Sequence, residues 1–114
     1  MKIELAAQGF ASMGSEARLT VLRCLVRAGE SGLSIGDIQD RTRIAPSTLA
    51  HHLKFLTGAE LVQQEKQGRT IINRANFERL RLLASFILSE CCADTVDLSA
   101  LGDLTSNDNE DRHG

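Results

Sequence analysis

The feature that most constrains the fold is a pair of short helical patterns joined by a four-residue connection in the middle of the chain. Ser34 and Asp37 predict a capped start for a helix over about residues 35–42. Thr42 to Ala45 form the connection, and Pro46 suits the first position of the next helix. The spacing is typical of a helix-turn-helix, whose second helix enters a groove of DNA.

The second of these helices is expected to have two different faces. One face is apolar apart from a histidine, with Leu49, His52, Leu53 and Leu56 at helical spacing. Most of the polar side chains lie away from that face and are free to meet a partner: Ser47, Thr48, His51 and Lys54. His52 shares the apolar face, so we interpret it as a partly buried packing residue and not as a base reader.

Two strand-like runs follow the helix-turn-helix, at residues 61–66 and 69–74, with Gln67 and Gly68 between them. They predict a β-hairpin. A hairpin in this position is a wing, and its tip would carry Lys66 and Arg69 where phosphate contacts require positive charge.

Three further helices are predicted around this motif. The first covers the apolar stripe of residues 3–10 and ends near Met13, and the second begins after the N-cap Ser15 and stops at Gly29. The second should face the core through Leu19, Leu22, Leu25 and Val26. The last begins after Asn76 and runs to about Cys92, with one apolar stripe at Leu80, Leu83, Ala84, Ile87 and Cys91, and more apolar surface at Leu82, Phe86 and Leu88. A helix this apolar predicts packing against a second copy of the chain.

Length and composition limit the alternatives. A chain of 114 residues predicts one domain, and it has neither an 18-residue apolar run nor a secretory signal, so we expect no membrane span and no secretion. Three cysteines without framework spacing indicate reduced thiols in a cytoplasm. We expect residues 1–92 to form the domain and residues 93–114 to form an acidic tail, mobile over 102–114.

The net charge of −2 is an average of two unlike parts. Residues 1–89 hold twelve Lys and Arg against eight Asp and Glu, whereas residues 90–114 hold one against seven. Residues 41–74 alone carry six basic and two acidic residues, so the positive excess falls on the helix-turn-helix and the wing. The overall charge therefore does not exclude a nucleic-acid partner.

Four segments in this order carry a family resemblance: residues 15–22, residues 33–38, the string Ser47-Thr48-Leu49-Ala50-His51-His52-Leu53-Lys54-Phe55-Leu56, and Gly68-Arg69. They resemble the ArsR/SmtB family of bacterial metal- and metalloid-responsive repressors over roughly residues 5–92. The resemblance implies a mainly α fold with a small β-hairpin wing, a winged helix-turn-helix that dimerises through its first and last helices. It also implies a homodimeric repressor that inserts the helix beginning at Pro46 into the major groove of double-stranded operator DNA and leaves when an inducer binds.

The chain departs from the family pattern at several positions. Where the family usually reads Ala-Gly-Leu-Val, this chain has Glu60 in place of the glycine. Glu is strained at positive φ, so either the chain turns at Gly58 instead or stability is lost locally. Ser34 and Gly36 occupy the positions of the Cys-x-Cys metalloid site of some relatives, so that site is absent, and the zinc ligands that others carry on the last helix are missing too.

Cys91 and Cys92 resemble the adjacent cysteine pair of arsenite- and organoarsenical-responsive relatives, although residues 93–114 hold no third cysteine. Adjacent thiols suit soft ligands, and a trivalent arsenical, arsenite or methylarsenite, is the inducer that the resemblance implies. On a regular helix the two side chains would point about 100° apart, whereas at a frayed helix end both can grip one atom. Tetrahedral zinc is disfavoured, because only Glu90, Asp94 and Asp97 lie nearby and no histidine does.

Alternatives stay open at this point. The inducer could be an oxidant or persulfide acting on the same thiols, although nearby acidic residues should raise thiol pKa values and disfavour a peroxide sensor. Cys24 is expected in the core, with a lesser role as a third sulfur or redox partner. A thiol oxidoreductase is disfavoured because the chain has no Cys-x-x-Cys, so we expect no enzyme and no constitutive cofactor. A winged helix used only for protein interaction is disfavoured by the basic 41–74 segment.

Overall fold

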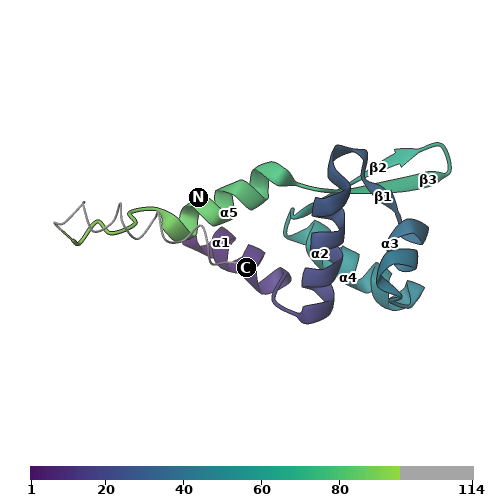
Figure 1. The fold of residues 1–114 in the computed structure, drawn as a ribbon, viewed down its shortest axis with the longest axis horizontal. Coiled ribbons are helices and arrows are strands. Elements are labelled where there is room, and N and C mark those ends of the chain that lie inside the picture. Colours follow the sequence, from purple (N-terminus) through teal and green to yellow (C-terminus); the bar gives the residue numbers. More distant parts are fainter. Residues whose placement is uncertain (96–114) are drawn as a thin grey trace.

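The computed structural model describes residues 1–95, and Figure 1 shows how their helices and strands are arranged. A short 3-10 turn covers Gly29–Ser31. The other elements are, in chain order, α1 (Ile3–Ser12), α2 (Glu16–Ala28), β1 (Leu33–Ser34), α3 (Ile35–Thr42), α4 (Pro46–Gly58), β2 (Val62–Gln67), β3 (Thr70–Ala75) and α5 (Phe77–Leu88). The predicted fold class, mainly α with a β-hairpin wing after a helix-turn-helix, is confirmed.

The predicted helix starts rest on the capping residues that the sequence indicated. Ser15 Oγ accepts a hydrogen bond from the backbone N–H of Arg18 at 3.1 Å. Ser34 and Asp37 form a complete capping box in front of α3, with bonds of 3.1 and 3.3 Å. Asn76 Oδ1 accepts from the N–H of Arg79 at 3.2 Å and so begins α5. These bonds satisfy backbone donors that a helix start leaves free.

The sheet has three antiparallel strands in the order β1-β3-β2. The sequence did not predict β1, because two residues are too few to show strand alternation. The hairpin also lies one residue later than predicted: Gln67 pairs with Thr70, so the turn is Gly68-Arg69, and Gly68 supplies the positive φ of 64°.

A buried asparagine fixes the base of the wing. The side chain of Asn73 is fully buried on β3. Its Nδ2 donates to the carbonyl of Leu33 at 3.1 Å, and its Oδ1 accepts from Gln64 Nε2 at 2.7 Å, so it joins all three strands. Gly32, at φ 69°, lets β1 approach, because a Cβ there would lie 2.6 Å from the Asn73 carbonyl oxygen.

The core lies between α2, α3, α4 and the sheet. Its fully buried apolar side chains are Val21, Leu25, Ile38, Leu49, Leu53, Leu56, Leu61 and Leu83. Two residues predicted to face it do not: Leu19 and Val26 stay 43% and 41% exposed on one side of α2. Helical spacing placed both residues on the core face, but in the structure they lie at its edge, where their side chains stay exposed.

Helices α1 and α5 pack together, away from the wing (Figure 1). Gly9 permits the contact, since a Cβ on it would lie 2.9 Å from Leu83 Cδ1. The α5 apolar stripe is only partly buried: Leu83 is inside, whereas Ala84, Ile87 and Cys91 are exposed. Ile3, Ile87 and Leu88 are each about two thirds exposed.

The predicted end of the last helix at Cys92 is wrong, because α5 ends at Leu88. Ser89 has an extended conformation, and its Oγ donates to the Phe86 carbonyl at 2.8 Å, which competes with continued helix. Glu90 then takes a left-handed φ of 63°. The two cysteines therefore follow the helix in turns.

The acidic tail predicted at 93–114, including its 102–114 segment, falls almost wholly outside the described residues. Within residues 1–95, every helix is too short or too polar to cross a membrane.

Candidate nucleic-acid interface and thiol pair

Helix α4 has the two faces that the sequence predicted. Its buried residues are Leu49, Leu53 and Leu56. All four of the predicted DNA-contacting side chains on α4 are exposed: Ser47, Thr48, His51 and Lys54. The structure thus presents them on the surface of one helix, which is the arrangement that groove insertion requires.

The first turn of α4 has backbone donors to spare. Ala45 precedes the helix and makes no side-chain cap, and Pro46 occupies the first turn. The exposed residues Ser47 and Thr48 lie in the same turn. Uncapped N–H groups at a helix N-terminus are suited to contact phosphate oxygens.

Phe55 is a candidate surface residue that the sequence reasoning did not select. Its ring is 46% exposed on α4. His51 meets it edge-on with ring centroids 5.0 Å apart, and the Arg18 guanidinium lies 4.8 Å from its centroid. Arg18 is itself held by a 2.6 Å bond from its Nε to the Ser12 carbonyl. These contacts fix the position of His51. The sequence could have indicated Phe55, because this aromatic residue directly follows Lys54 on the polar face of the helix.

Both predicted phosphate-contacting residues of the wing are exposed: Lys66 lies near the end of β2, and Arg69 lies in the hairpin turn itself. The nearest acidic residue in sequence, Glu65, is bound to Arg74 across the hairpin. The hydrogen bond from Arg74, followed by its charge, lowers the pKa of the Glu65 carboxyl, which keeps this pair ionised. Glu65 therefore does not neutralise the tip.

His52 is half-buried, as predicted. Its Nδ1 is buried and has no hydrogen-bond partner among residues 1–95. Burial is the main reason that the pKa of His52 lies below its ordinary 6.5, and the positive charge of Arg18 and the nearby His51 lower it further. His52 thus packs against the core as a neutral side chain.

The conformation of Glu60 decides between the two alternatives for the position where the family pattern has glycine. The chain does not turn at Gly58, which is the last helical residue; Glu60 itself has a left-handed φ of 63°. Its carboxylate lies 3.0 Å from Arg79, and its carbonyl accepts from Asn76 Nδ2 at 2.9 Å. Both partners belong to the start of α5, so the strained residue connects α4 to α5.

The two adjacent thiols lie close together. Cys91 Sγ and Cys92 Sγ are 3.7 Å apart, with Cys91 exposed and Cys92 half-buried. The pKa of Cys92 is raised, first by the hydrogen bond with Cys91, then by burial and by the Cys91 charge. The direction agrees with the prediction, but the cause is the neighbouring thiol and not the acidic residues.

Cys24 is buried on α2, within the core cluster, as predicted. Among residues 1–95, no three side chains of His, Cys, Asp or Glu are grouped so that they could hold a metal ion. The third-sulfur role considered for Cys24 gains no support from this arrangement. Asp97, considered near the thiols, lies outside the described residues.

Comparisons with known proteins agree with the fold. The family model of a helix-turn-helix domain matches residues 13–65. The uncharacterized HTH-type transcriptional regulator YceK of Bacillus subtilis (strain 168) is 33% identical over 67 residues, which are 59% of this chain and 66% of that protein. The structure of an ArsR-like transcriptional regulator from Rhodococcus sp. RHA1 is 26% identical, with a TM-score of 0.69 over 91% of this chain and 92% of that one. The chain is thus similar in sequence to helix-turn-helix transcriptional regulators, and its fold is similar to that of an ArsR-like regulator.

A third comparison concerns the fold alone. NolR from Sinorhizobium fredii is 21% identical, with a TM-score of 0.62 over 78% of this chain and 86% of that one. The similar proteins are named as transcriptional regulators, which agrees with the prediction that the chain is not an enzyme. In this chain the Ser34 hydroxyl caps α3, so the position that resembles part of a Cys-x-Cys site serves helix initiation instead.

Proposed function

We propose that the chain is a homodimeric repressor that inserts α4 into the major groove of operator DNA and places the wing on the flanking phosphates. The observation that carries this proposal is that the acidic residues of this surface are paired with arginines, whereas its proposed DNA-contacting cations are unpaired. Glu60 and Glu65, the two acids of the basic 41–74 segment, are each bound to an arginine. Over residues 1–95, no carboxylate pairs with Lys54, Lys66 or Arg69. Unpaired surface cations are what phosphate binding requires.

The roles on α4 follow from position. Ser47 and Thr48, with the uncapped N-terminus, suit phosphates or base edges, because hydroxyls and backbone donors can bond to either. Lys54 suits a phosphate or a guanine, and His51, steadied by Phe55, suits a base edge.

Dimerisation through α1 and α5 is supported by their exposed apolar side chains. Those exposed by more than 40% are Ile3, Leu5, Leu82, Ile87 and Leu88. Side chains of this size on two adjacent helices are typical of a surface that a second copy covers. Two copies would also present two α4 helices to two half-sites.

A variant of Lys54 tests the role of this residue in DNA binding. Lys54→Ala should weaken binding to every duplex alike and reduce the slope of log affinity against log salt by about 0.9, because one phosphate charge is no longer neutralised. Arg81→Ala, which removes an exposed arginine of α5, is the matched control and should leave the slope unchanged. An effect confined to one base pair would contradict the phosphate role of Lys54. Wild-type protein without salt-dependent duplex binding would contradict the function itself.

We further propose that a trivalent arsenical is the inducer and that Cys91 and Cys92 bind it. A metal–thiolate bond is about 2.3 Å long, so one atom can bridge sulfurs up to about 4.6 Å apart. The Cys91–Cys92 separation of 3.7 Å meets this condition without rearrangement of a helix. Within residues 1–95 the site offers two thiolates and not three.

The raised pKa of Cys92 favours an arsenical over an oxidant. Binding breaks two S–H and two As–O bonds, forms two As–S and two O–H bonds and releases two waters, so it needs no electron acceptor. Oxidation begins from a thiolate, and the raised pKa of Cys92 reduces that form.

The connection between α4 and α5 supports a route from the thiols to the DNA. Cys91 and Cys92 follow α5, and the start of α5 is bound to the end of α4 through Arg79, Asn76 and Glu60. The N–H of Asn76 also donates to the Leu61 carbonyl at 2.8 Å. A change in the direction of α5 would therefore move α4 with it.

Titration of the reduced protein on its own promoter DNA tests the inducer. Arsenite or methylarsenite should release the DNA at lower concentration than zinc or peroxide does. Release by peroxide or persulfide alone would identify a redox repressor of the same fold and contradict the arsenical proposal.

A further inference from the structure

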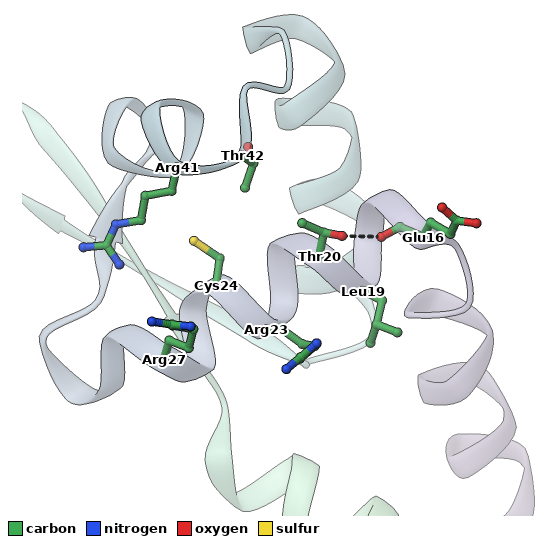
Figure 2. Close-up of a pocket in the computed structure, with 8 residues that line it drawn as sticks. All are labelled: Glu16, Leu19, Thr20, Arg23, Cys24, Arg27, Arg41 and Thr42. Atoms are coloured by element: carbon green, nitrogen blue, oxygen red, sulfur yellow. Dashed lines mark hydrogen bonds between the residues drawn. The ribbon is translucent and has the colours of Figure 1, made fainter. Parts of the chain in front are cut away.

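A groove of about 750 Å³ lies between α2 and α3 and holds three arginines (Figure 2). Arg23 and Arg27 come from α2, and Arg41 comes from the last turn of α3. The remaining lining residues are Glu16, Leu19, Thr20, Cys24 and Thr42. None of the lining residues belongs to α4 or the wing, so the groove is separate from the DNA-contacting side chains.

The arginines are the groove's uncommitted hydrogen-bond donors. Among residues 1–95, none of their three guanidinium groups makes an ion pair or a hydrogen bond. The guanidinium groups of Arg74 and Arg79, in contrast, are paired. The two hydroxyls of the groove are already used: Thr20 Oγ1 donates to the Glu16 carbonyl at 2.8 Å, and Thr42 Oγ1 donates to the Ile38 carbonyl at 2.9 Å.

The charges are divided between the two ends of the groove. Figure 2 shows Arg27 and Arg41 toward one end, with the Cys24 thiol between their helices, and the Glu16 carboxylate at the other. Glu16 and Arg27 lie about 16 Å apart along the helix axis, at about 1.5 Å per residue. The glutamate is thus too distant to neutralise the arginine end.

We propose that this groove binds a small anion with two or more phosphate or carboxylate groups at Arg27 and Arg41, with Arg23 at its edge. Guanidinium groups match the planar oxygen pairs of both ligand types and bind them in a bidentate manner. Like charges on facing helices repel, and a multivalent anion between them removes that repulsion. The site shares no residue with the thiol pair or with the DNA-contacting side chains proposed on α4 and the wing.

Calorimetric titration of the reduced full-length chain tests the proposal. Sodium pyrophosphate and sodium citrate serve as the phosphate and carboxylate probes, each compared with sodium chloride at equal ionic strength. Saturable binding of at least one probe is expected. The double variant Arg27→Gln/Arg41→Gln should bind about tenfold or more weakly, and each single variant should show a smaller decrease, because charge-assisted hydrogen bonds are removed. Arg81→Gln is the matched control and should bind as wild type does.

Three results would overturn the proposal. One is no binding of either probe beyond the chloride baseline. Another is equal affinity in wild type and the double variant, which would indicate unspecific anion condensation. The third concerns duplex binding: a smaller salt slope in the double variant than in wild type, when the wild-type protein binds neither probe, would assign the groove to DNA phosphates.

Discussion

The carboxylate of Glu60, just after the end of α4, lies 3.0 Å from the guanidinium of Arg79 in the first turn of α5. Glu60 holds a φ of 63°, which costs a non-glycine residue about 1 kcal/mol. The Glu60 side chain is 67% exposed, whereas that of Arg79 is 19% exposed, and solvent at Glu60 limits the contribution of the pair to stability to about 0–1 kcal/mol. The value of this arrangement lies in joining two helices more than in stability.

Two substitutions at this position separate strain from pairing. Glu60→Gly relieves the strain and removes the pair, whereas Glu60→Ala removes the pair and keeps the strain. We expect the glycine variant to be more stable than the alanine variant by about 1 kcal/mol, measured by urea unfolding at one protomer concentration. Equal stability of the two variants would show that the left-handed conformation is not retained in solution.

Much of the fold could be predicted because local signals were strong. Ser34 with Asp37, Pro46 and Asn76 each mark a helix start by a hydrogen bond or a fixed φ that depends on neighbouring residues alone. The polar face of α4 followed from helical spacing. Such features require no knowledge of distant contacts.

The errors arose where distant contacts decide the structure. Strand β1 exists because it pairs with β3, where Asn73, about forty residues later, donates a hydrogen bond from Nδ2 to the Leu33 carbonyl. The α5 end at Leu88 is a local exception, because Ser89 Oγ donates to the Phe86 carbonyl three residues earlier and this bond competes with the otherwise apolar helix. The groove of arginines could not be predicted because it joins α2 to α3 through packing and not through sequence proximity.

Two glycine positions near β1 should respond to alanine in opposite ways. Gly32→Ala places a Cβ 2.6 Å from the Asn73 carbonyl oxygen at a φ of 69°, so we expect a decrease in stability of about 1–3 kcal/mol. Gly36→Ala lies within α3, where the Cβ meets only Ser34 Oγ at 3.8 Å, and should increase stability by about 0.5–1 kcal/mol. Thermal or urea unfolding measures both. If Gly32→Ala is as stable as wild type, the close contact between β1 and β3 is wrong.

The proposed dimer surface predicts a localised effect of charge. Ile87 is 64% exposed on α5, and Ile87→Asp should weaken dimerisation about tenfold or more, since a buried apolar side chain contributes about 1.5–3 kcal/mol. Ile71→Asp, at a 44% exposed wing position, is the control. Sedimentation over a concentration series measures both. Unchanged sedimentation of Ile87→Asp would place the interface elsewhere.

Stability should fall in mild acid because of His52. Its pKa is lowered in the folded chain, so below about 6.5 the unfolded chain takes up a proton that the folded chain resists. The contribution of His52 to the free energy of unfolding is therefore largest above its pKa in the unfolded chain. This contribution decreases as the pH falls from that pKa toward the pKa in the folded chain. His52→Gln should reduce this decrease between about pH 7.5 and pH 5.5. An identical pH dependence in wild type and variant would contradict the burial of His52.

Control of DNA release by Cys91 and Cys92 is central to the proposed function. The most direct measurement is fluorescence anisotropy of promoter duplex bound to reduced protein during titration with methylarsenite. Wild type and the control Cys24→Ala should release the duplex at the same concentration, whereas Cys91→Ser and Cys92→Ser should bind the duplex as wild type does and fail to release it. Release from the serine variants at the wild-type concentration would contradict this role of the two thiols.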